Sequence, residues 1–388
     1  MNVLYLDWPC FGVVDCMLTL EKTFSCRLTK FSHKDYLERE SPDFDRAFDA
    51  AAKERRFDFA FSYNFYPLFA EGCHRHSIPY ISIVYDSPFV KLYSRRLLYP
   101  TNHVYLFDNA VCQELRARGI ETVHYTVLPV NSDVIRTMLK KPYDRKRTMA
   151  EVSFVGALYN EEYNLFDQLN GKLEPYMRGF LSGIMEAQLL VSGYSFIEEL
   201  LTDEVVEKLE KAEPVEAYPD GMESKAYGYA NYYIARKLTA MERERLLTKV
   251  GERFPLKLFT LDPDARIPGA VNMGITDYYN EMPYVFHNSR INLNISLRSI
   301  KSGIPLRCMD IFGAGGFLLS NYQADLAEAF VPGEEFVYFE DAEDLIRKID
   351  YFLSHESERA RIAENGHRKA KEKYSFEKVF RRILEESL

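Results

Sequence analysis

The densest group of residues able to do chemistry in this sequence of 388 residues lies between Ser302 and Gly316. It reads SGIPLRCMDIFGAGG and follows a β-rich run at residues 291–295. Gly303 and Pro305 suit a tight loop that leads into a helix N-terminus, where free N–H groups and the helix dipole favour a phosphate or a sugar hydroxyl. We therefore expect Ser302 and Gly303 to belong to an anion-binding loop.

Two charged residues follow on that helix. Arg307 falls in the first turn, where a cation opposes the helix dipole, so its natural partner is a ligand anion or a buried carboxylate. Asp310 lies three residues further along on the same face, where it can accept hydrogen bonds from ribose hydroxyls or pair with Arg307. A purely structural Arg307–Asp310 ion pair is the plainer alternative. Gly313, Gly315 and Gly316 are too many for a helix end alone and indicate close backbone approach.

Two aspartates at the ends of expected strands are candidate catalytic bases. Asp86 follows an apolar run at residues 81–85 and precedes Ser87 and Pro88, a placement that puts a carboxylate at the carboxyl edge of a parallel sheet. Asp7 ends the first expected strand and is the second candidate. The alternative for Asp86 is the capping of a helix that begins at Pro88, and the alternative for Asp7 is a cap or turn.

Two sheets are needed to position these residues. In the first 130 residues short β-rich runs alternate with helical patterns, which is typical of a parallel sheet covered by helices. There the expected strands are 3–6, 24–31, 57–61, 80–85, 103–107 and 122–128, and the expected helices are 43–56 and 109–118. Later the expected strands are 152–155, 256–260, 271–273, 291–295, 317–320 and 336–338, with helices at 278–287, 306–314, 341–353, 356–373 and 375–388.

The expected domain boundary is the polar, proline-containing segment 140–147. We expect an α/β protein with a first doubly wound domain at residues 1–140 and a second at 148–373. Within the second, residues of about 160–250 have helical periodicity only and form an expected insertion. Residues 374–388 form a C-terminal helix. Ligands bind at the carboxyl ends of such strands, so a cleft between the domains is the expected active site.

Several classes of protein are excluded by motif or composition. Neither the loop after the first strand nor the sequence GALYN from Gly156 to Asn160 has the GxGxxG spacing of dinucleotide-binding proteins, and GxxxxGK[ST] is absent. Asp262-Pro263-Asp264 and Cys73-His74-Arg75-His76 have the residue types of metal ligands, but the first reads as a turn and the second lacks a partner cluster. We therefore expect no metal site.

The charge and cysteine content point to a partner class and a compartment. There are 49 basic and 58 acidic side chains, giving a net charge of −9, which disfavours nucleic acid and anionic lipid as partners. The longest stretch without Asp, Glu, Lys or Arg, residues 311–324, is too short for a membrane span, and residues 1–8 do not resemble a signal peptide. The six cysteines include no CxxC pair, so we expect them to be buried thiols without a disulfide framework. We expect a cytoplasmic protein without an integral membrane segment.

Several segments resemble one family. RINLNISLRSIKSGIPLRCMDIFGAGGFLLSNYQADLAE and FVPGEEFVYFEDAEDLIRKIDYFLSHESERARIAENGHRKA resemble the nucleotide-sugar-binding half of glycosyltransferases of the spore maturation protein B (CgeB-like) type. VLYLDWPCFG, FSYNFYPL, YISIVYDSP and VYLFDNAVCQELRARGI are similar to the N-terminal domain of that family. The resemblance covers nearly the whole chain. It implies a GT-B architecture, with two facing Rossmann-like domains, the donor held mainly by the second, and no metal requirement. It also implies that the C-terminal helix, residues 374–388, crosses back to the N-terminal domain.

The resemblance also assigns donor-binding positions. In related GT-B transferases two acidic residues contact the donor sugar and the ribose. The second matches Asp310, whereas the first falls on Ser302, which is not acidic and departs from the pattern. Arg307 is similar to the arginine that precedes the acidic residue. The remaining expected donor-binding residues are Gly156, Asn160, Gly274, Gly303, Gly315 and Gly316.

The expected function is metal-independent transfer of a sugar from a nucleotide diphosphate sugar, UDP-sugar favoured, to a glycan, a protein or a small molecule. The nucleotide sugar is a co-substrate, and no cofactor is expected. Arg307 would stabilise the departing diphosphate, and Asp86 or Asp7 would act on the acceptor. Two alternatives stay open: a nucleotide-sugar epimerase or hydrolase on the same fold, and a noncatalytic protein that binds nucleotide or glycan.

Overall fold

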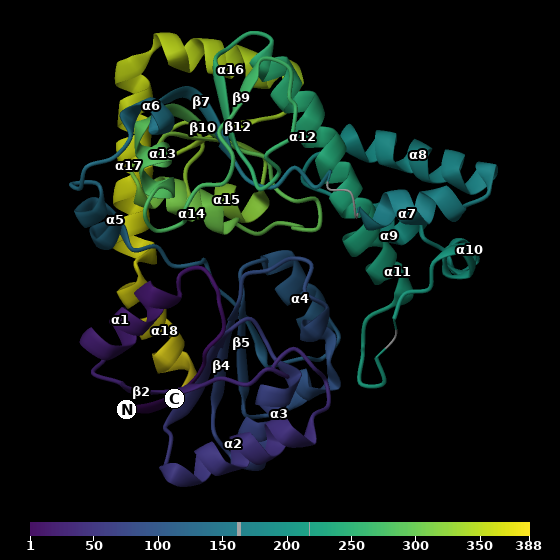
Figure 1. Cartoon of the computed structure of the whole chain (residues 1–388), viewed down its shortest axis with the longest axis vertical. Coiled ribbons are helices and arrows are strands. Elements are labelled where there is room, and N and C mark those ends of the chain that lie inside the picture. Colours follow the sequence, from purple (N-terminus) through teal and green to yellow (C-terminus); the bar gives the residue numbers. More distant parts are fainter. Residues whose placement is uncertain (161–163, 217) are drawn as a thin grey trace. The chain divides into compact units, whose positions relative to one another are not determined.

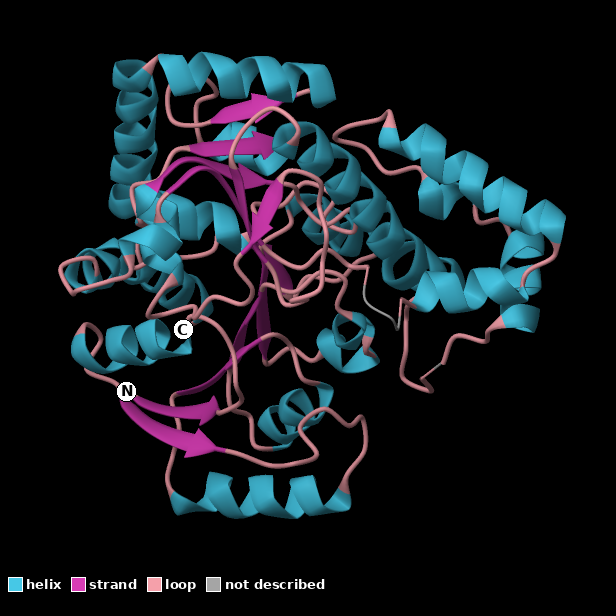
Figure 2. Cartoon of the chain, turned by 45° about the horizontal axis from the view of Figure 1, so that its top comes forward, coloured by secondary structure: helices cyan, strands magenta, loops and turns pink. Residues whose placement is uncertain are grey.

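The computed structural model describes residues 1–160, 164–216 and 218–388. The chain divides into two compact units (Figure 1). The first unit contains Met1–Pro129, residues 218–223 and Lys373–Leu388, and the second contains Val130–Glu216 and Ser224–Glu372. Among the described residues, the strands form one six-stranded parallel sheet in each unit, and helices flank both sheets (Figure 2). The fold class predicted from the sequence is confirmed.

The sheet of the first unit has the order β2-β1-β3-β4-β5-β6. Its strands are β1 (Asn2–Leu6), β2 (Arg27–Phe31), β3 (Phe59–Tyr63), β4 (Tyr80–Val84), β5 (Asn102–Leu106) and β6 (Val123–Tyr125). Its helices are α1 (Val13–Lys22), α2 (Pro42–Glu54), α3 (Pro67–Arg75), α4 (Asn109–Ala117) and α18 (Phe376–Ser387), with 3₁₀ turns at Val90–Tyr93 and Arg95–Leu98. The chain winds from β1 to β2 on one side and from β3 to β6 on the other, so the winding direction changes between β1 and β3.

The sheet of the second unit has the order β12-β11-β10-β7-β8-β9. Its strands are β7 (Ala150–Val155), β8 (Leu256–Phe259), β9 (Ala270–Asn272), β10 (Ser289–Asn294), β11 (Leu318–Asn321) and β12 (Val337–Phe339). Helices around it are α5 (Ser132–Met138), α6 (Arg145–Thr148), α12 (Ala235–Gly251), α13 (Met282–Asn288), α14 (Leu306–Gly313), α15 (Ala324–Ala329), α16 (Ala342–Ser354) and α17 (Glu356–Tyr374). Here the winding direction changes between β7 and β10.

The residue types explain these elements. The central strands β3 and β4 read FAFSY and YISIV, and every residue in them is buried, as expected for parallel strands covered on both faces. Helix α2 begins with Pro42 after Ser41, whose side chain accepts a hydrogen bond from the Phe44 N–H. Asp341 caps α16 by accepting from the Asp344 N–H, as the sequence predicts. Local capping and continuous apolar runs therefore fix most element boundaries.

The described residues of the insertion between β7 and β8 form helices joined by loops, and the predicted helical character is confirmed; residues 161–163 and 217 lie outside the described residues. It contains α7 (Leu165–Lys172), α8 (Pro175–Leu189), α9 (Ile197–Leu200), α10 (Asp203–Ala212), α11 (Lys225–Gly228) and a π-helical turn (Tyr229–Ile234) that runs into α12. These helices bury an apolar cluster of their own, which includes Leu169, Leu181 and Leu238. The insertion is a small packed core attached to the sheet through α12 (Figure 1).

The last helix, α18, packs within the first unit. The Phe380 ring lies 5.5 Å from the Phe61 ring of β3, and Ile383 is fully buried. The Tyr105 hydroxyl of β5 lies 3.0 Å from the Ser387 hydroxyl. The apolar face seen in the sequence of this helix therefore covers the first sheet.

Some local expectations are wrong. The strand expected at 24–31 begins only at Arg27, because residues before it form a turn in which Ser25 has a φ of 52°. The helix expected at 278–287 begins at Met282, because the Asp277 carboxylate accepts from the N–H groups of Tyr279 and Asn280 and forms a turn. Helix α1 was not expected, and of α3 only the helix end at Cys73–His76 was expected. Their short amphipathic patterns are hard to separate from strand patterns.

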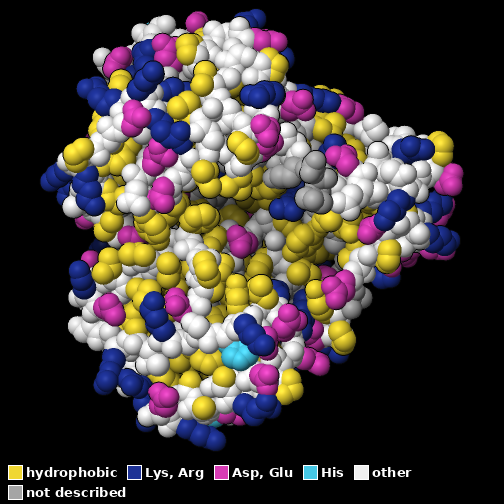
Figure 3. Space-filling view, in the orientation of Figure 1, with side chains coloured by type: hydrophobic (Ala, Val, Ile, Leu, Met, Phe, Trp, Pro, Cys, Tyr) yellow, Lys and Arg dark blue, Asp and Glu magenta, His cyan; other side chains and the backbone are white. Residues whose placement is uncertain are grey.

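No helix within the described residues is long and apolar enough to cross a membrane. All six cysteines are free thiols. Figure 3 shows basic and acidic side chains interspersed over the visible face, which agrees with a surface of mixed charge.

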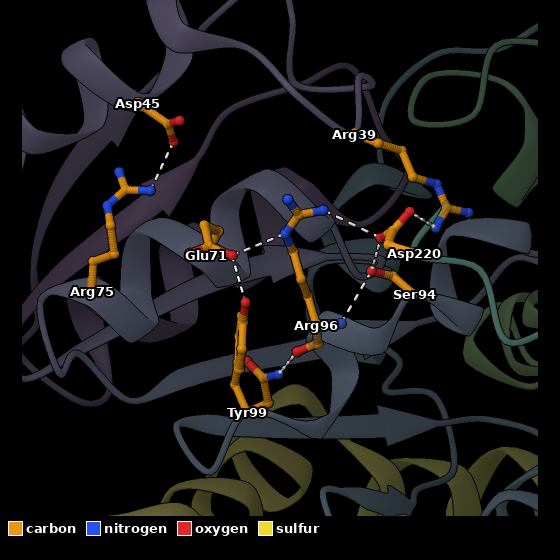
Figure 4. Close-up of polar contacts among 9 residues, drawn as sticks. Arg39, Asp45, Glu71, Arg75, Ser94, Arg96, Tyr99 and Asp220 are labelled. Atoms are coloured by element: carbon orange, nitrogen blue, oxygen red, sulfur yellow. Dashed lines mark hydrogen bonds and ion pairs between the residues drawn. The ribbon is translucent and has the colours of Figure 1, made fainter. Parts of the chain in front are cut away.

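Residues 218–223 leave the helical insertion and bind to the first unit through a carboxylate (Figure 4). Asp220 Oδ1 lies 3.0 Å from Arg39 Nη1, and Asp220 Oδ2 lies 3.2 Å from Arg96 Nη1. The Ser94 hydroxyl also donates to Asp220. Arg96 in turn pairs with Glu71 at 3.0 Å. Burial opposes ionisation of Asp220, but the Ser94 hydrogen bond and the two arginines lower its pKa. The charged carboxylate therefore anchors this segment.

We predict that Asp220→Asn lowers the free energy of unfolding of the first unit by about 1–3 kcal/mol at pH 7, because it leaves Arg39 and Arg96 without their shared counter-charge. The measurement is urea unfolding followed by the emission of Trp8, the single tryptophan, which belongs to this unit. The pKa of Asp220 is lowered by folding, so its contribution is present above the ordinary carboxyl pKa and fades as the pH falls through the lowered value. The gap between wild type and variant should close in acid.

The control is Asp43→Asn, which removes an exposed i,i+3 pair with Arg46 and should change the free energy of unfolding by about 0.5 kcal/mol or less. Equal stability of wild type and Asp220→Asn at pH 7 would contradict the anchoring role.

Candidate functional site

The candidate site of the second unit lies where its sheet changes winding direction. Strands β7 and β10 are neighbours, and their ends lead into loops that begin at Gly156 and Ile295. Loops that diverge at such a point leave a crevice at the carboxyl edge of the sheet, which is where ligands bind in open parallel sheets. The side chains that line this position come from α12 and from the first turn of α14.

Arg243 of α12 bridges the two loops. Its guanidinium donates to the carbonyl groups of Ala157, after β7, and of Ile295, after β10, the latter through Nε at 3.1 Å. The side chain is buried, with the guanidinium 5.2 Å from the centre of the Phe154 ring and 5.0 Å from that of Tyr159. Burial lowers the pKa of Arg243 to about 10; Tyr159 opposes this, and the charge of Arg307 adds to it. Sequence analysis gave no sign of this residue.

Arg307 lies on the other side of the β7 loop and is half-buried. Its guanidinium packs flat against Gly156: a Cβ atom added at that glycine would lie 2.8 Å from Arg307 Nη2. It also lies 5.9 Å from the centre of the Phe154 ring. Burial lowers the pKa of the guanidinium, and Tyr159 and Asp310 oppose that shift. Position 156 therefore requires glycine, because any side chain there would clash with the Arg307 guanidinium.

The expected alternative, a structural Arg307–Asp310 ion pair, is not formed: in the described part of the chain neither Arg307 nor Arg243 takes part in an ion pair. Asp310 instead accepts a hydrogen bond from the Tyr278 hydroxyl at 3.0 Å. Carbonyl groups satisfy the N–H groups of Arg243 without cancelling its charge. Two neighbouring guanidinium groups therefore keep their positive charge, an arrangement that fits a phosphate or diphosphate.

The start of α14 adds backbone donors beside Arg307. The helix begins at Leu306 with Pro305 as its N-cap, and Pro305 provides no side-chain cap. Ser302 and Gly303 are buried in the preceding loop, where the Ser302 carbonyl accepts from the Asp325 N–H at 3.0 Å. The loop predicted from the sequence is thus held against α15 and delivers a helix N-terminus to the crevice.

The other predicted donor-binding residues are more scattered. Gly315 and Gly316 follow the far end of α14 and lead into the start of β11, away from Arg307. A Cβ atom at Gly316 would lie 2.6 Å from Asn292 Nδ2, so this glycine is needed for packing. Gly274 has a φ of 72° and open space around it, and Asn160 is exposed. The structure brings together Gly156, Arg307 and Asp310, and leaves Gly315 and Gly316 apart from them.

The candidate base of the first unit is held by a residue that sequence analysis missed. Asn64, directly after β3, is fully buried and has a φ of 56°. Its Nδ2 donates to Asp86 Oδ2 at 2.7 Å, and its Oδ1 accepts from the N–H of Tyr85 at 3.1 Å and that of Asp86 at 3.4 Å. Asparagine is the common non-glycine residue in this conformation, so its place after an apolar strand is the signal that was available.

Asp86 itself is exposed, and desolvation by its surroundings raises the pKa of its carboxyl, against the hydrogen bond from Asn64. The alternative that Asp86 caps a helix at Pro88 is wrong, because the next helical turn begins at Val90 with Phe89 as its N-cap. Asp7, after β1, lies 3.5 Å from Lys30 Nζ. Of the two candidates, Asp86 thus has the environment of a base, and Asp7 has a counter-charge.

Among the described residues no group of three or more His, Cys, Asp or Glu side chains is placed to hold a metal ion. Asp262 accepts from the Asp264 N–H at 2.9 Å and forms the turn expected there. In the CHRH segment, His74 stacks on Tyr99, and His76 lies 2.7 Å from Asp49 Oδ1. Both segments have local structural roles.

The contact between Gly156 and Arg307 predicts a double-mutant cycle. Gly156→Ala should lower the free energy of unfolding of the second unit by about 1–3 kcal/mol, because the new methyl group displaces the guanidinium. The double variant Gly156→Ala/Arg307→Ala should lose less unfolding free energy than the sum of the losses in the two single variants. The measurement is urea unfolding followed by circular dichroism.

Gly274→Ala is the matched control. Gly274, like Gly156, has a positive φ, but a Cβ atom added there would meet no other atom. This variant should therefore lose about 1–2 kcal/mol of unfolding free energy from the backbone conformation alone, and its loss should show no coupling to that of Arg307→Ala. Additive losses for Gly156 and Arg307 would show that the two residues do not depend on each other.

Comparisons with known proteins agree with this architecture. Residues 238–385 match a family model described as "Glycosyl transferase-like". No curated protein compared with the chain matches it. The match does not name the CgeB-like family, so that narrower resemblance stays a prediction.

Similar solved structures include HepE of Anabaena in complex with UDP and glucose, at 12% identity over 100% of this chain and 99% of that one, with a TM-score of 0.53. Sucrose-phosphate synthase from Thermosynechococcus elongatus is 10% identical over 100% of both chains, with a TM-score of 0.53. A UDP-forming α,α-trehalose-phosphate synthase from Burkholderia xenovorans is 12% identical over 100% and 99%, with a TM-score of 0.52. The fold of this chain is therefore the GT-B fold.

Proposed function

We propose that the protein transfers a sugar from a nucleotide diphosphate sugar to an acceptor hydroxyl without a metal ion. The observation that carries this proposal is the pair of guanidinium groups, Arg243 and Arg307, which keep their charge beside Gly156 at the carboxyl edge of the second sheet. Such a pair fits the two negative charges of a diphosphate. UDP-sugar is the favoured donor, and the solved structures with UDP or a UDP-forming reaction support that choice.

Leaving-group stabilisation is the proposed task of Arg307. Negative charge builds up on the diphosphate as its bond to the anomeric carbon breaks, and a fixed cation with few competing partners stabilises this charge most in the transition state. The backbone N–H groups at the start of α14 add to the effect. Arg243, whose N–H groups already bind carbonyls, would act mainly through its charge.

Asp310 is proposed to bind the ribose. Its carboxylate is oriented by the Tyr278 hydroxyl at 3.0 Å and can accept a further hydrogen bond from a sugar hydroxyl. Ser302 and Gly303 would shape the loop next to the donor sugar. Gly274 and Asn160 stay proposed donor contacts.

Asp86 is the proposed catalytic base. It would take the proton of the acceptor hydroxyl while the acceptor oxygen bonds to the anomeric carbon and the nucleoside diphosphate leaves. Its raised pKa makes it a stronger base than an ordinary carboxylate, and Asn64 fixes its orientation. Asp7 is less suited because Lys30 Nζ lies 3.5 Å from its carboxylate and provides a counter-charge.

The test is the release of nucleoside diphosphate from UDP-sugars in the presence of EDTA, with and without a panel of acceptors. Asp86→Asn should lower kcat by about 10²–10⁴-fold, because the amide cannot accept the proton. Asp7→Asn is the matched control and should stay within about threefold of wild type. A base must be ionised to act, so kcat/KM should rise with pH through the raised pKa of Asp86, and its acid limb should lie above the range of an ordinary aspartate.

Three results would contradict the proposal. Unchanged turnover in Asp86→Asn removes that residue as the base. Free or isomerised sugar formed without acceptor indicates the hydrolase or epimerase. Donor binding without release of diphosphate across the whole panel indicates a noncatalytic binding protein.

A further inference from the structure

Four aromatic side chains that follow the carboxyl ends of β1 to β4 contact one another, and Asp86 also follows β4; we call the four rings the aromatic platform: Trp8, Tyr36, Tyr66 and Phe89. The Trp8 ring centre lies 6.3 Å from that of Tyr36, in a stacked arrangement, and 5.8 Å from that of Tyr66, edge to face. Tyr66 also lies 5.3 Å from Tyr36 and 6.3 Å from Phe89. The rings come from four separate segments that meet where this sheet changes its winding direction.

The platform and the carboxylate share one support. Trp8 Nε1 donates to the Tyr63 carbonyl at 3.1 Å, and the next residue, Asn64, holds Asp86 at 2.7 Å. Two consecutive residues at the end of β3 therefore fix the indole on one side and the carboxylate on the other. Burial is the main cause that raises the pKa of the Tyr66 hydroxyl, and Tyr80, Tyr36 and then Asp86 add to the shift in the same direction.

The aromatic platform is only partly buried in the hydrophobic core of the first unit. Tyr66 is buried, but Trp8, Tyr36 and Phe89 keep part of their surface open, and Asp86 is exposed. Partly open rings with a polar group beside them are the usual composition of a small-molecule site, in which apolar walls hold the ligand and a few polar atoms orient it.

We propose that the aromatic platform binds the ring of a neutral saccharide acceptor, with the C–H face of the sugar against Trp8 and Tyr36 and one hydroxyl directed at Asp86. This rests on the proposed function and names the substrate class of that site. Aromatic faces suit C–H groups, and a carboxylate accepts a hydroxyl hydrogen bond. The same carboxylate repels an anionic sugar, so neutral glycosides are favoured over uronic acids.

The experiment uses the full chain without donor. Trp8 is the single tryptophan, so its emission reports on the platform alone. Titration with methyl hexopyranosides and short neutral oligosaccharides should give a saturable change in emission. Tyr36→Ala should weaken binding about tenfold, whereas Tyr36→Phe, which keeps the ring, should bind as wild type does. Tyr176→Ala, at an exposed tyrosine of α8, is the matched control and should bind like wild type.

Charge selectivity gives a second readout that a merely structural platform would not show. Methyl glucuronide should bind at least about fivefold more weakly than methyl glucoside in wild type, and Asp86→Asn should narrow this difference. No saturable change with any neutral saccharide would overturn the inference, as would equal binding in wild type and Tyr36→Ala. Binding restricted to glycosides with an aromatic aglycone would also overturn it.

The failure of this inference can be told from failure of the proposed function by titrating the same protein with UDP-sugar. If UDP-sugar binds and the saccharides do not, the acceptor assignment is wrong and the donor site stands. If the saccharides bind and no nucleotide sugar does, the platform stands and the transferase proposal is wrong.

Discussion

Arg243 joins the two loops that diverge where the second sheet changes its winding direction, and the proposed donor site depends on that bridge. Its N–H groups are satisfied by the carbonyls of Ala157 and Ile295, so the loops after β7 and β10 are held at a fixed separation. The bridge leaves a buried positive charge, and Arg307 places a second one nearby. Like charges removed from water destabilise a protein that holds no ligand. Binding an anion between them would relieve this repulsion, which is the physical reason to read the arrangement as a ligand site.

Both units use their topology in the same way. In each, a parallel sheet reverses its winding direction beside its first strand, and chemistry-bearing residues collect at the carboxyl ends there. The two units differ in the charge of the residues at these strand ends. The second unit presents guanidinium groups and a helix N-terminus, which suit a diphosphate, whereas the first presents Asp86 beside aromatic rings, which suit a neutral hydroxylated ring. In the proposed reaction these are complementary tasks. The site of the second unit stabilises the leaving nucleoside diphosphate, and Asp86 of the first unit takes the proton of the acceptor hydroxyl.

The sequence was informative where physical signals are local. Apolar runs such as residues 59–63 and capping residues such as Asp341 located most strands and helices, and the loop before Arg307 could be recognised from Gly303 and Pro305. Arg243 could not be found, because its carbonyl partners lie far away in sequence and its helix carries many charged residues. Asp220 belongs to a Pro-Asp-Gly sequence that predicts only a turn, and its ion pairs with Arg39 and Arg96 appear only in three dimensions. The sequence does not assign a role to Gly315 and Gly316, since close packing and close ligand approach both favour glycine.

The central claim is that Arg307 and Arg243 hold the diphosphate of a nucleotide. Calorimetric titration of the full chain with UDP, GDP and dTDP, in EDTA, tests it most directly, with Arg307→Ala and the exposed-arginine control Arg178→Ala measured beside wild type. We expect UDP to bind with a Kd of roughly micromolar order, Arg307→Ala to weaken UDP binding at least about tenfold, and Arg178→Ala to leave it unchanged. Absence of binding by all three nucleotides, or unchanged UDP affinity in Arg307→Ala, would contradict it.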